Sequence, residues 1–149
     1  MAKSDAQKIS RLGDVAAIRE REAAQEFAAC LTKYNQHMRQ IGELKHYRQD
    51  YARRLAGDGN PAISAHEAQR LAGFIANIDK LISNMNEQAE ILNSAVRESR
   101  QAWQIVKSKM KSFEKLAAAR AAKSDQQQNQ RLASQLEDAW LARNFSRFR

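Results

Sequence analysis

The residues that most often carry catalysis or bind metals are few and scattered in this chain. The histidines are His37, His46 and His66, and the single cysteine is Cys30. A metal ion needs ligands that converge on one point, and His37, Cys30 and Asp50 could meet only if a helix folded back on itself. No pair of carboxylates marks a pocket in which a pKa would be shifted. The sequence therefore predicts neither an enzyme nor a metal or cofactor site, and we interpret Cys30 as a small apolar helix residue.

Positive charge is concentrated between residues 97 and 123. The whole chain has 25 lysines and arginines against 17 acidic residues, a formal net charge of +8. In this stretch only Glu98 and Glu114 oppose eight basic residues, which leaves a local balance of +6. We call the eight residues the basic collar: Arg97, Arg100, Lys107, Lys109, Lys111, Lys115, Arg120 and Lys123.

Three classes of function are compatible with such a collar. Clustered lysines and arginines bind nucleic acid by releasing counterions from phosphate. That function is disfavoured here because the only aromatic residues nearby, Trp103 and Phe113, fit the apolar stripe of a helix, and because no helix-turn-helix or zipper fork is present. A solvated helix face and a docking site for an acidic protein surface both remain open, since complementary charge steers proteins together.

A second cluster combines two tyrosines with apolar residues. Tyr47 and Tyr51 lie four residues apart, so they share one side of a helix. A phenol at such a position keeps its ring on apolar surface and its hydroxyl in water, which suits either the edge of a thin core or a partner site. The residues that we expect around this cluster are Gln40, Leu44, Tyr47, Tyr51, Phe74 and Ile78.

The elements that position these residues are predicted to be two long helices. One proline, five glycines and only 7% aromatic residues are typical of a coiled coil. After the glycine at position 73, apolar residues return at steps of three and four over about seven heptads, which requires a partner helix. The predicted seam, beside which Ala89, Val96, Trp103 and Met110 suggest a sideways drift, is Leu71, Phe74, Ile78, Leu81, Met85, Leu92, Ala95, Ala102, Val106, Phe113 and Leu116.

The chain has one strong turn signal, at residues 57–61, which read Gly-Asp-Gly-Asn-Pro. Before it, a first helix of about residues 5–56 should be capped by Ser4 or Asp5. After a tip of about residues 57–64, the spacing of Ser64 and Glu67 predicts a capping box that starts a second helix of about residues 65–145. The apolar stripe of the first helix is Ile9, Leu12, Ala16, Ala23, Phe27, Cys30, Leu31, Tyr34, Met38, Ile41, Leu44, Tyr51 and Leu55.

The predicted fold is therefore all-α, a single antiparallel coiled-coil hairpin over residues 1–149. Facing residues should have numbers that add up to about 122, because both helices rise equally per residue. This register places Phe27 near Ala95 and Val96, and Ile9 near Phe113. The second helix then overhangs the first after Ala117, and the tail keeps only a few apolar residues: Leu132, Leu136, Trp140, Leu141, Phe145 and Phe148. No signal peptide or membrane span is recognisable, so we expect a cytoplasmic protein.

The stretch from Leu44 to Tyr51, the Phe74-Ile75 pair with Ile78-Asp79 one turn later, and Trp103 before a basic helix resemble the FliJ family. The resemblance covers most of the chain. It implies a non-enzymatic component of the bacterial flagellar type III export apparatus, similar in shape to the two-helix coiled coil of the rotary ATP synthase γ subunit. Such a protein acts as a stalk in the hexameric export ATPase and touches the export gate with its other end, and escort of export chaperones is a further implied role.

By this resemblance, the gate's cytoplasmic domain would bind the tyrosine cluster, namely Gln40, Leu44, Tyr47, Tyr51, Phe74 and Ile78. The ATPase ring would contact five residues of the basic collar, Arg100, Lys107, Lys111, Lys115 and Arg120. The protein would then lie at the cytoplasmic face of the inner membrane, held there peripherally by the export apparatus, and would bind no nucleic acid. Two alternatives remain: the stalk protein of an injectisome secretion system, and a free coiled-coil adaptor or scaffold.

Overall fold

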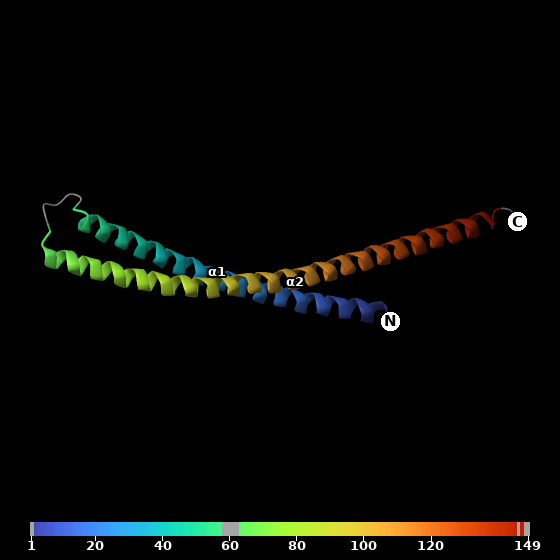
Figure 1. Ribbon diagram of the computed structural model, residues 1–149. Coiled ribbons are helices and arrows are strands. Elements are labelled where there is room, and N and C mark those ends of the chain that lie inside the picture. The colour runs from blue at the N-terminus through green and yellow to red at the C-terminus, as the bar shows by residue number, and fades with distance from the viewer. Residues whose placement is uncertain (1, 58–62, 146, 148–149) are drawn as a thin grey trace. The chain divides into compact units, whose positions relative to one another are not determined.

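The computed structural model describes residues 2–57, 63–145 and 147, with side chains from residue 4 onward. Within these residues the chain forms two α-helices and no strand: α1, Ala2–Leu55, and α2, Ala65–Phe145 (Figure 1). The all-α helical hairpin is thus confirmed. The chain divides into two compact units. We call residues 22–104 the tip unit, and residues 1–21 with residues 105–149 the terminal unit.

The ends of α1 follow from local chemistry. The helix begins at Ala2, so Ser4 and Asp5 lie inside its first turn, and the expected cap at these residues is wrong. Asp5 still stabilises this end, because a carboxylate complements the positive pole of the helix dipole. Beyond Leu55, Gly57 adopts a φ of 80° and donates its N–H to the Arg54 carbonyl at 3.2 Å, a left-handed ending that favours glycine. The remaining turn formers, Asp58 to Pro61, lie outside the described residues.

The start of α2 has the cap that the sequence predicted. The Ser64 hydroxyl accepts a hydrogen bond from the Glu67 N–H at 3.2 Å, and the Ser64 carbonyl accepts one from the Ala68 N–H at 3.0 Å. These bonds satisfy amides that the first turn of a helix leaves without partners. The forward bond of the predicted capping box is therefore present.

In the tip unit, buried and half-buried positions recur at alternating steps of three and four without a break. On α1 these positions are Ala23, Phe27, Cys30, Tyr34, His37, Ile41, Leu44, Arg48 and Tyr51. On α2 they are Ala68, Leu71, Ile75, Ile78, Ile82, Met85, Ala89, Leu92, Val96, Ser99 and Trp103. This is the heptad seam of a coiled coil. The seam is thin, since only Ile41 is fully buried, with 1% of its surface exposed.

The seam of α2 differs from the predicted one at several heptads. Phe74 and Leu81 are about half exposed, and Ala102 is exposed. The seam passes instead through the next residue in each case, such as Ile75 and Ile82, so it keeps one track and does not drift. The error has a physical cause: adjacent positions are both apolar at these heptads, and periodicity alone cannot choose between them.

Four contacts show that the helices of the tip unit are antiparallel. From one contact to the next, the residue number on α1 decreases while the residue number on α2 increases. The contacts are Tyr51 with Phe74, Arg48 with Asp79, His37 with Met85, and Phe27 with Trp103. The paired numbers add up to between 122 and 130, so the predicted sum of 122 lies at the lower limit. In particular, Phe27 stacks on Trp103, a pair whose numbers add up to 130, whereas the predicted register paired Phe27 with Ala95 and Val96.

The terminal unit is packed with smaller residues. Ala16 is buried, and Ile9, Gly13, Ala17, Met110 and Phe113 are half-buried, whereas the predicted seam residues Leu12 and Leu116 are 51% and 45% exposed. A hollow of about 300 Å³ remains, lined by Ile9, Ser10, Gly13, Asp14, Ala17, Met110, Phe113, Glu114 and Ala117. Every side chain of α2 from residue 114 to residue 143 is exposed, so the overhang stays helical without cover. Among the described residues, no helix is suited in length and apolarity to crossing a membrane.

Candidate partner-binding surfaces

An exposed strip runs along one side of the tip unit. Gln40 and Tyr47 on α1, and Phe74 and Leu81 on α2, each come directly before a seam residue. In an antiparallel pair such positions of the two helices lie on the same side of the seam. Tyr47 is 55% exposed, Phe74 48% and Leu81 47%, and Gln40 is also exposed. We call these four residues the apolar strip.

The structure brings all six residues predicted for gate binding into the tip unit. Gln40, Tyr47 and Phe74 belong to the apolar strip, while Leu44, Tyr51 and Ile78 are half-buried seam residues beneath it. Sequence reasoning missed Leu81 as a surface residue, because it was assigned to the seam. Its spacing of seven from Phe74 was the signal that both residues share one side of α2.

A hollow near the hairpin tip adjoins the apolar strip at Phe74. The rings of Tyr51 and Phe74 are stacked with centroids 6.0 Å apart, and the Arg54 guanidinium lies 5.9 Å from the centroid of the Tyr51 ring. The hollow has a volume of about 570 Å³. We call it the tip pocket, and its lining residues are Tyr51, Arg54, Ile63, Glu67, Arg70, Leu71 and Phe74.

Two polar seam residues fix the register of the tip unit. The Arg48 guanidinium donates to both carboxylate oxygens of Asp79, with Nη2 to Oδ2 at 3.3 Å. This hydrogen bond is the main cause that lowers the pKa of Asp79 and raises that of Arg48. About three turns earlier on α1, His37 Nε2 lies 2.7 Å from the Met85 carbonyl oxygen and donates to it when that nitrogen carries the proton. Polar contacts of this kind are satisfied in one register only, so they oppose slippage of the helices.

The basic collar is divided between the units. In the tip unit, the Arg100 guanidinium lies 5.3 Å from the centroid of the Phe27 ring, which is itself stacked on Trp103 with centroids 5.7 Å apart. A cation over an aromatic face is held by the ring electrons. Arg100 is therefore engaged in the packing around Phe27, and the aromatic residues of this region serve the seam.

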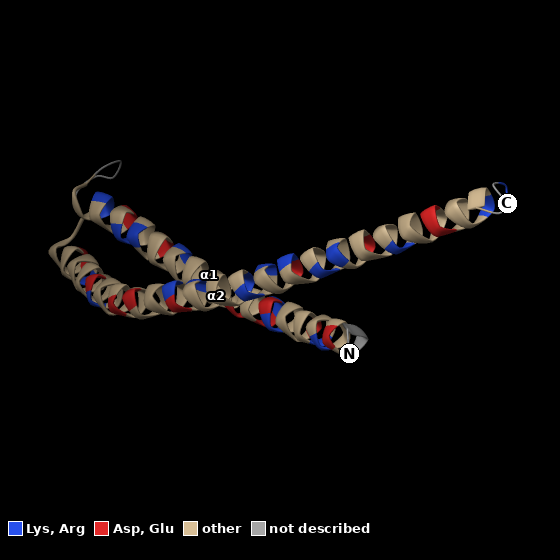
Figure 2. Ribbon diagram, turned by 90° about the vertical axis from the view of Figure 1, so that its right-hand side faces the viewer, with Lys and Arg blue, Asp and Glu red and all other residues tan. Residues whose placement is uncertain are grey.

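In the terminal unit, Lys107, Lys111 and Lys115 follow one another at steps of four. Such steps turn by only about 40° each, so the three lysines share one side of α2. Figure 2 shows the Lys and Arg positions along α2 in blue. Lys111 and Lys115 are exposed and Lys107 is half-buried. Arg120 lies about 140° further around the helix than Lys115, so the structure does not bring it to the same side. We call the three lysines the lysine row.

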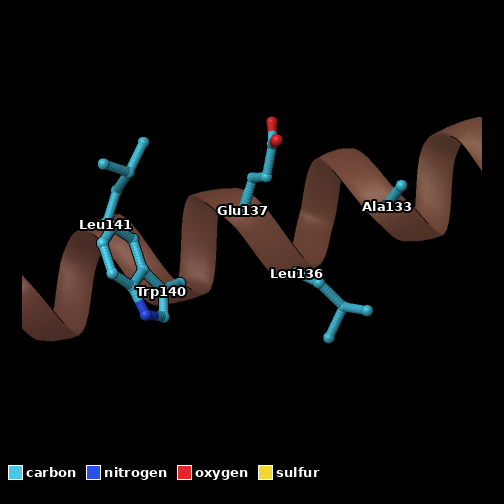
Figure 3. A pocket seen from close by; sticks show the side chains of 5 residues that line it. All are labelled: Ala133, Leu136, Glu137, Trp140 and Leu141. Carbon is cyan, nitrogen blue, oxygen red and sulfur yellow. The ribbon is translucent and has the colours of Figure 1, made fainter.

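The tail of α2 carries an apolar face that does not continue the seam. Continued at steps of three and four beyond Phe113, the seam would pass through Ala117 and then through polar positions such as Arg120, Ser124 and Gln127. The exposed Leu132, Leu136 and Trp140 occupy another side of the helix. Figure 3 shows the residues that line a shallow hollow of about 600 Å³ here: Ala133, Leu136, Glu137, Trp140 and Leu141.

Comparison with known proteins identifies the family. A family model described as "Flagellar FliJ protein" matches residues 6–147, nearly the whole chain. The chain belongs to the FliJ family. No curated protein and no solved structure gives a significant match to it.

Membership of the FliJ family makes this chain a component of the flagellar type III export apparatus. Proteins of this family are non-enzymatic components of the export apparatus. In the described part of this FliJ chain, no three His, Cys, Asp or Glu side chains lie close enough together to hold a metal ion. The exposed surfaces described above are the apolar strip, the tip pocket, the lysine row and the apolar face of the tail.

Proposed function

We propose that this FliJ chain is a stalk that links the hexameric export ATPase to the cytoplasmic domain of the export gate. The observation that carries the proposal is the division of its exposed surfaces: an apolar strip lies in the tip unit and a lysine row lies in the terminal unit. A linker between two partners needs two surfaces of different chemistry on different parts of the chain. The proposed location, at the cytoplasmic face of the inner membrane, follows from these partners.

The apolar strip supports the gate end of the proposal. Tyr47, Phe74 and Leu81 expose about half of their surface on one side of the hairpin, over a seam that holds them in place. Exposed aromatic residues on a rigid support are the usual anchors of protein interfaces. Leu44, Tyr51 and Ile78 would act beneath them by positioning the exposed side chains.

The lysine row supports the ATPase end. Three ammonium groups on one side of α2, within a chain of net charge +8, set up a field that attracts an acidic surface and speeds encounter. Arg100 and Arg120 were grouped with these lysines on the sequence. We now assign the ring contact to the lysine row, because Arg100 packs on Phe27 and Arg120 lies on another side of the helix. Escort of export chaperones would use the apolar face of the tail.

The proposal is tested by reversing charge on two sides of α2. The variant Lys111→Glu with Lys115→Glu inverts most of the lysine row, and the matched control Lys109→Glu with Arg120→Glu makes the same change of charge on the opposite side. ATP hydrolysis by the purified export ATPase is measured with each protein at low and high salt. We expect wild-type stimulation to fall as salt rises, since exposed charges are screened over about 8 to 10 Å.

We expect the lysine-row variant to stimulate hydrolysis poorly at low salt and the control to stimulate it like the wild type. If both variants lose stimulation equally, the net charge of the protein determines stimulation and the position of the lysine row does not. If the wild type does not stimulate hydrolysis, a free adaptor is favoured. If the wild type retains duplex DNA in a gel shift and the lysine-row variant does not, a nucleic-acid binder is favoured.

A further inference from the structure

The tip pocket combines two kinds of chemistry. One wall is apolar and aromatic, formed by the stacked Tyr51 and Phe74 rings with Leu71. Among the described lining residues, the rim carries two guanidinium groups, Arg54 and Arg70, and one carboxylate, Glu67, so the formal charge of these residues is positive. These residues come from both helices of the tip unit and lie within a single hollow.

The guanidinium of Arg54 is already oriented. Its carbon lies over the Tyr51 ring, 5.9 Å from the ring centroid, and this cation–π contact holds the group at the rim. The N–H groups of a guanidinium donate in a fork that fits a carboxylate. Arg70, on the first turns of α2, adds a second fork at the same rim.

We propose that the tip pocket selects its partner by charge and shape together. It takes a protein segment in which an aliphatic or aromatic side chain is flanked by Asp or Glu. The apolar side chain packs on Tyr51, Leu71 and Phe74, while the carboxylate is bound by Arg54 and Arg70. This inference rests on the proposed function, because Phe74 belongs both to the pocket and to the apolar strip, so the segment would be part of the export gate.

The size and walls of the pocket favour a protein segment over a small anion. Its volume of about 570 Å³ is that of a site for several side-chain groups, and its wall combines apolar and polar surface. Continuity with the exposed Tyr47 and Phe74 extends the surface beyond the pocket itself. A small free anion would leave these rings exposed to water.

The main experiment compares neighbouring arginines on the last turn of α1. Arg54→Glu reverses charge in the pocket, and Arg53→Glu makes the same change one residue earlier, about 100° around the helix and outside the lining residues. Both variants carry the same net charge and the same charge near the end of α1. Binding of each full-length chain to the purified cytoplasmic domain of the export gate is measured by calorimetry, with circular dichroism as the control for folding.

We expect Arg54→Glu to weaken binding about tenfold more than Arg53→Glu does, because only the former repels the partner's carboxylate. Arg70→Glu should act in the same direction. Glu67→Gln should instead tighten binding by about twofold, because it removes a negative charge that the described part of the rim carries. Equal affinities of the Arg54 and Arg53 variants, with Glu67→Gln unchanged, would overturn the inference.

Two further measurements separate this inference from the proposed function. Tyr47→Ala changes the apolar strip outside the pocket. If Tyr47→Ala weakens gate binding while Arg54→Glu and Arg53→Glu bind the gate equally, gate binding stands and selection by charge is overturned.

A peptide array tests the pocket without the gate. Its peptides carry Leu or Phe anchors flanked either by Asp or Glu, or by Asn or Gln. We expect the acidic set to bind more strongly, and this preference to be lost in Arg54→Glu. Equal binding of both sets would contradict the inference.

Discussion

The tip unit and the terminal unit are built from the same two helices but differ in what holds them together. The tip unit has large seam residues and two aromatic stacks. It also has the Arg48–Asp79 ion pair and the contact of the His37 ring nitrogen with the Met85 carbonyl oxygen. The terminal unit has a buried Ala16, a hollow lined in part by Gly13 and Ala17, and then a long exposed stretch of α2. The comparison teaches that a coiled coil can concentrate its register-fixing contacts in one region and leave another region packed with small residues and largely exposed.

The largest expected difference lies between removing a buried seam side chain of the tip unit and removing an exposed apolar side chain of the terminal unit. Ile41→Ala in the tip unit removes the only fully buried large side chain among the described residues and should lower the free energy of unfolding by about 2 to 4 kcal/mol. Ile18→Ala in the terminal unit removes a side chain that is 53% exposed and should cost less than about 1 kcal/mol. Urea unfolding followed by circular dichroism measures both, and similar costs would contradict the contrast.

Glycine substitutions provide a second, smaller test. A Cβ added at Gly13 in the terminal unit or at Gly42 in the tip unit would meet no atom within 4 Å. Each change to alanine should therefore stabilise its helix by about 0.5 to 1 kcal/mol, because glycine loses more backbone entropy on folding. Amide exchange near each site reports the gain locally. A loss of stability at Gly13 alone would show that the hollow beside it must stay open.

The smallest expected effect is the pH dependence of the stability that the Arg48–Asp79 ion pair contributes. The Arg48 guanidinium lowers the pKa of Asp79 below its ordinary value of 3.8, so the ionised carboxylate contributes stability above that value. This contribution is lost as the pH falls through the lowered pKa of the folded state. The difference in stability between the wild type and Asp79→Asn should therefore be present at neutral pH and vanish in strong acid. Because both side chains are about half exposed, salt should also reduce it. If the difference in stability between the wild type and Asp79→Asn persists in strong acid, it arises from packing and not from the ion pair.

Much of the fold was predictable from the residues. The turn formers after Leu55 and the spacing of Ser64 and Glu67 predicted where the chain reverses and where α2 is capped. The alternation of three and four predicted that a partner helix is needed. The track of the seam was not predictable from the apolar pattern alone, because neighbouring residues of α2 are both apolar at several heptads and because the polar His37 and Arg48 take seam positions on α1.

The candidate surfaces were predictable in part. The spacing of Tyr47 and Tyr51 pointed to the side of the hairpin that carries the apolar strip. Arg54 and Arg70 could not be singled out on the sequence, because charged residues are common throughout both helices and only the folded tip unit places these two at one rim. Likewise, counting charges between residues 97 and 123 grouped Arg100 with the lysines, whereas the structure packs it on Phe27.

The contacts of the tip unit also set an order of folding. Arg48 and Asp79 are separated by 31 residues and His37 and Met85 by 48, so the loop that must close grows as contacts lie further along the helices from the turn. Closing a longer loop costs more chain entropy. We expect the hairpin to zip up from the turn outward, each contact shortening the loop that the next must close. On the ribosome, α1 emerges before any of α2, so its apolar stripe stays uncovered until the second helix is made, and the newly made chain is most prone to pair with a neighbour during that interval.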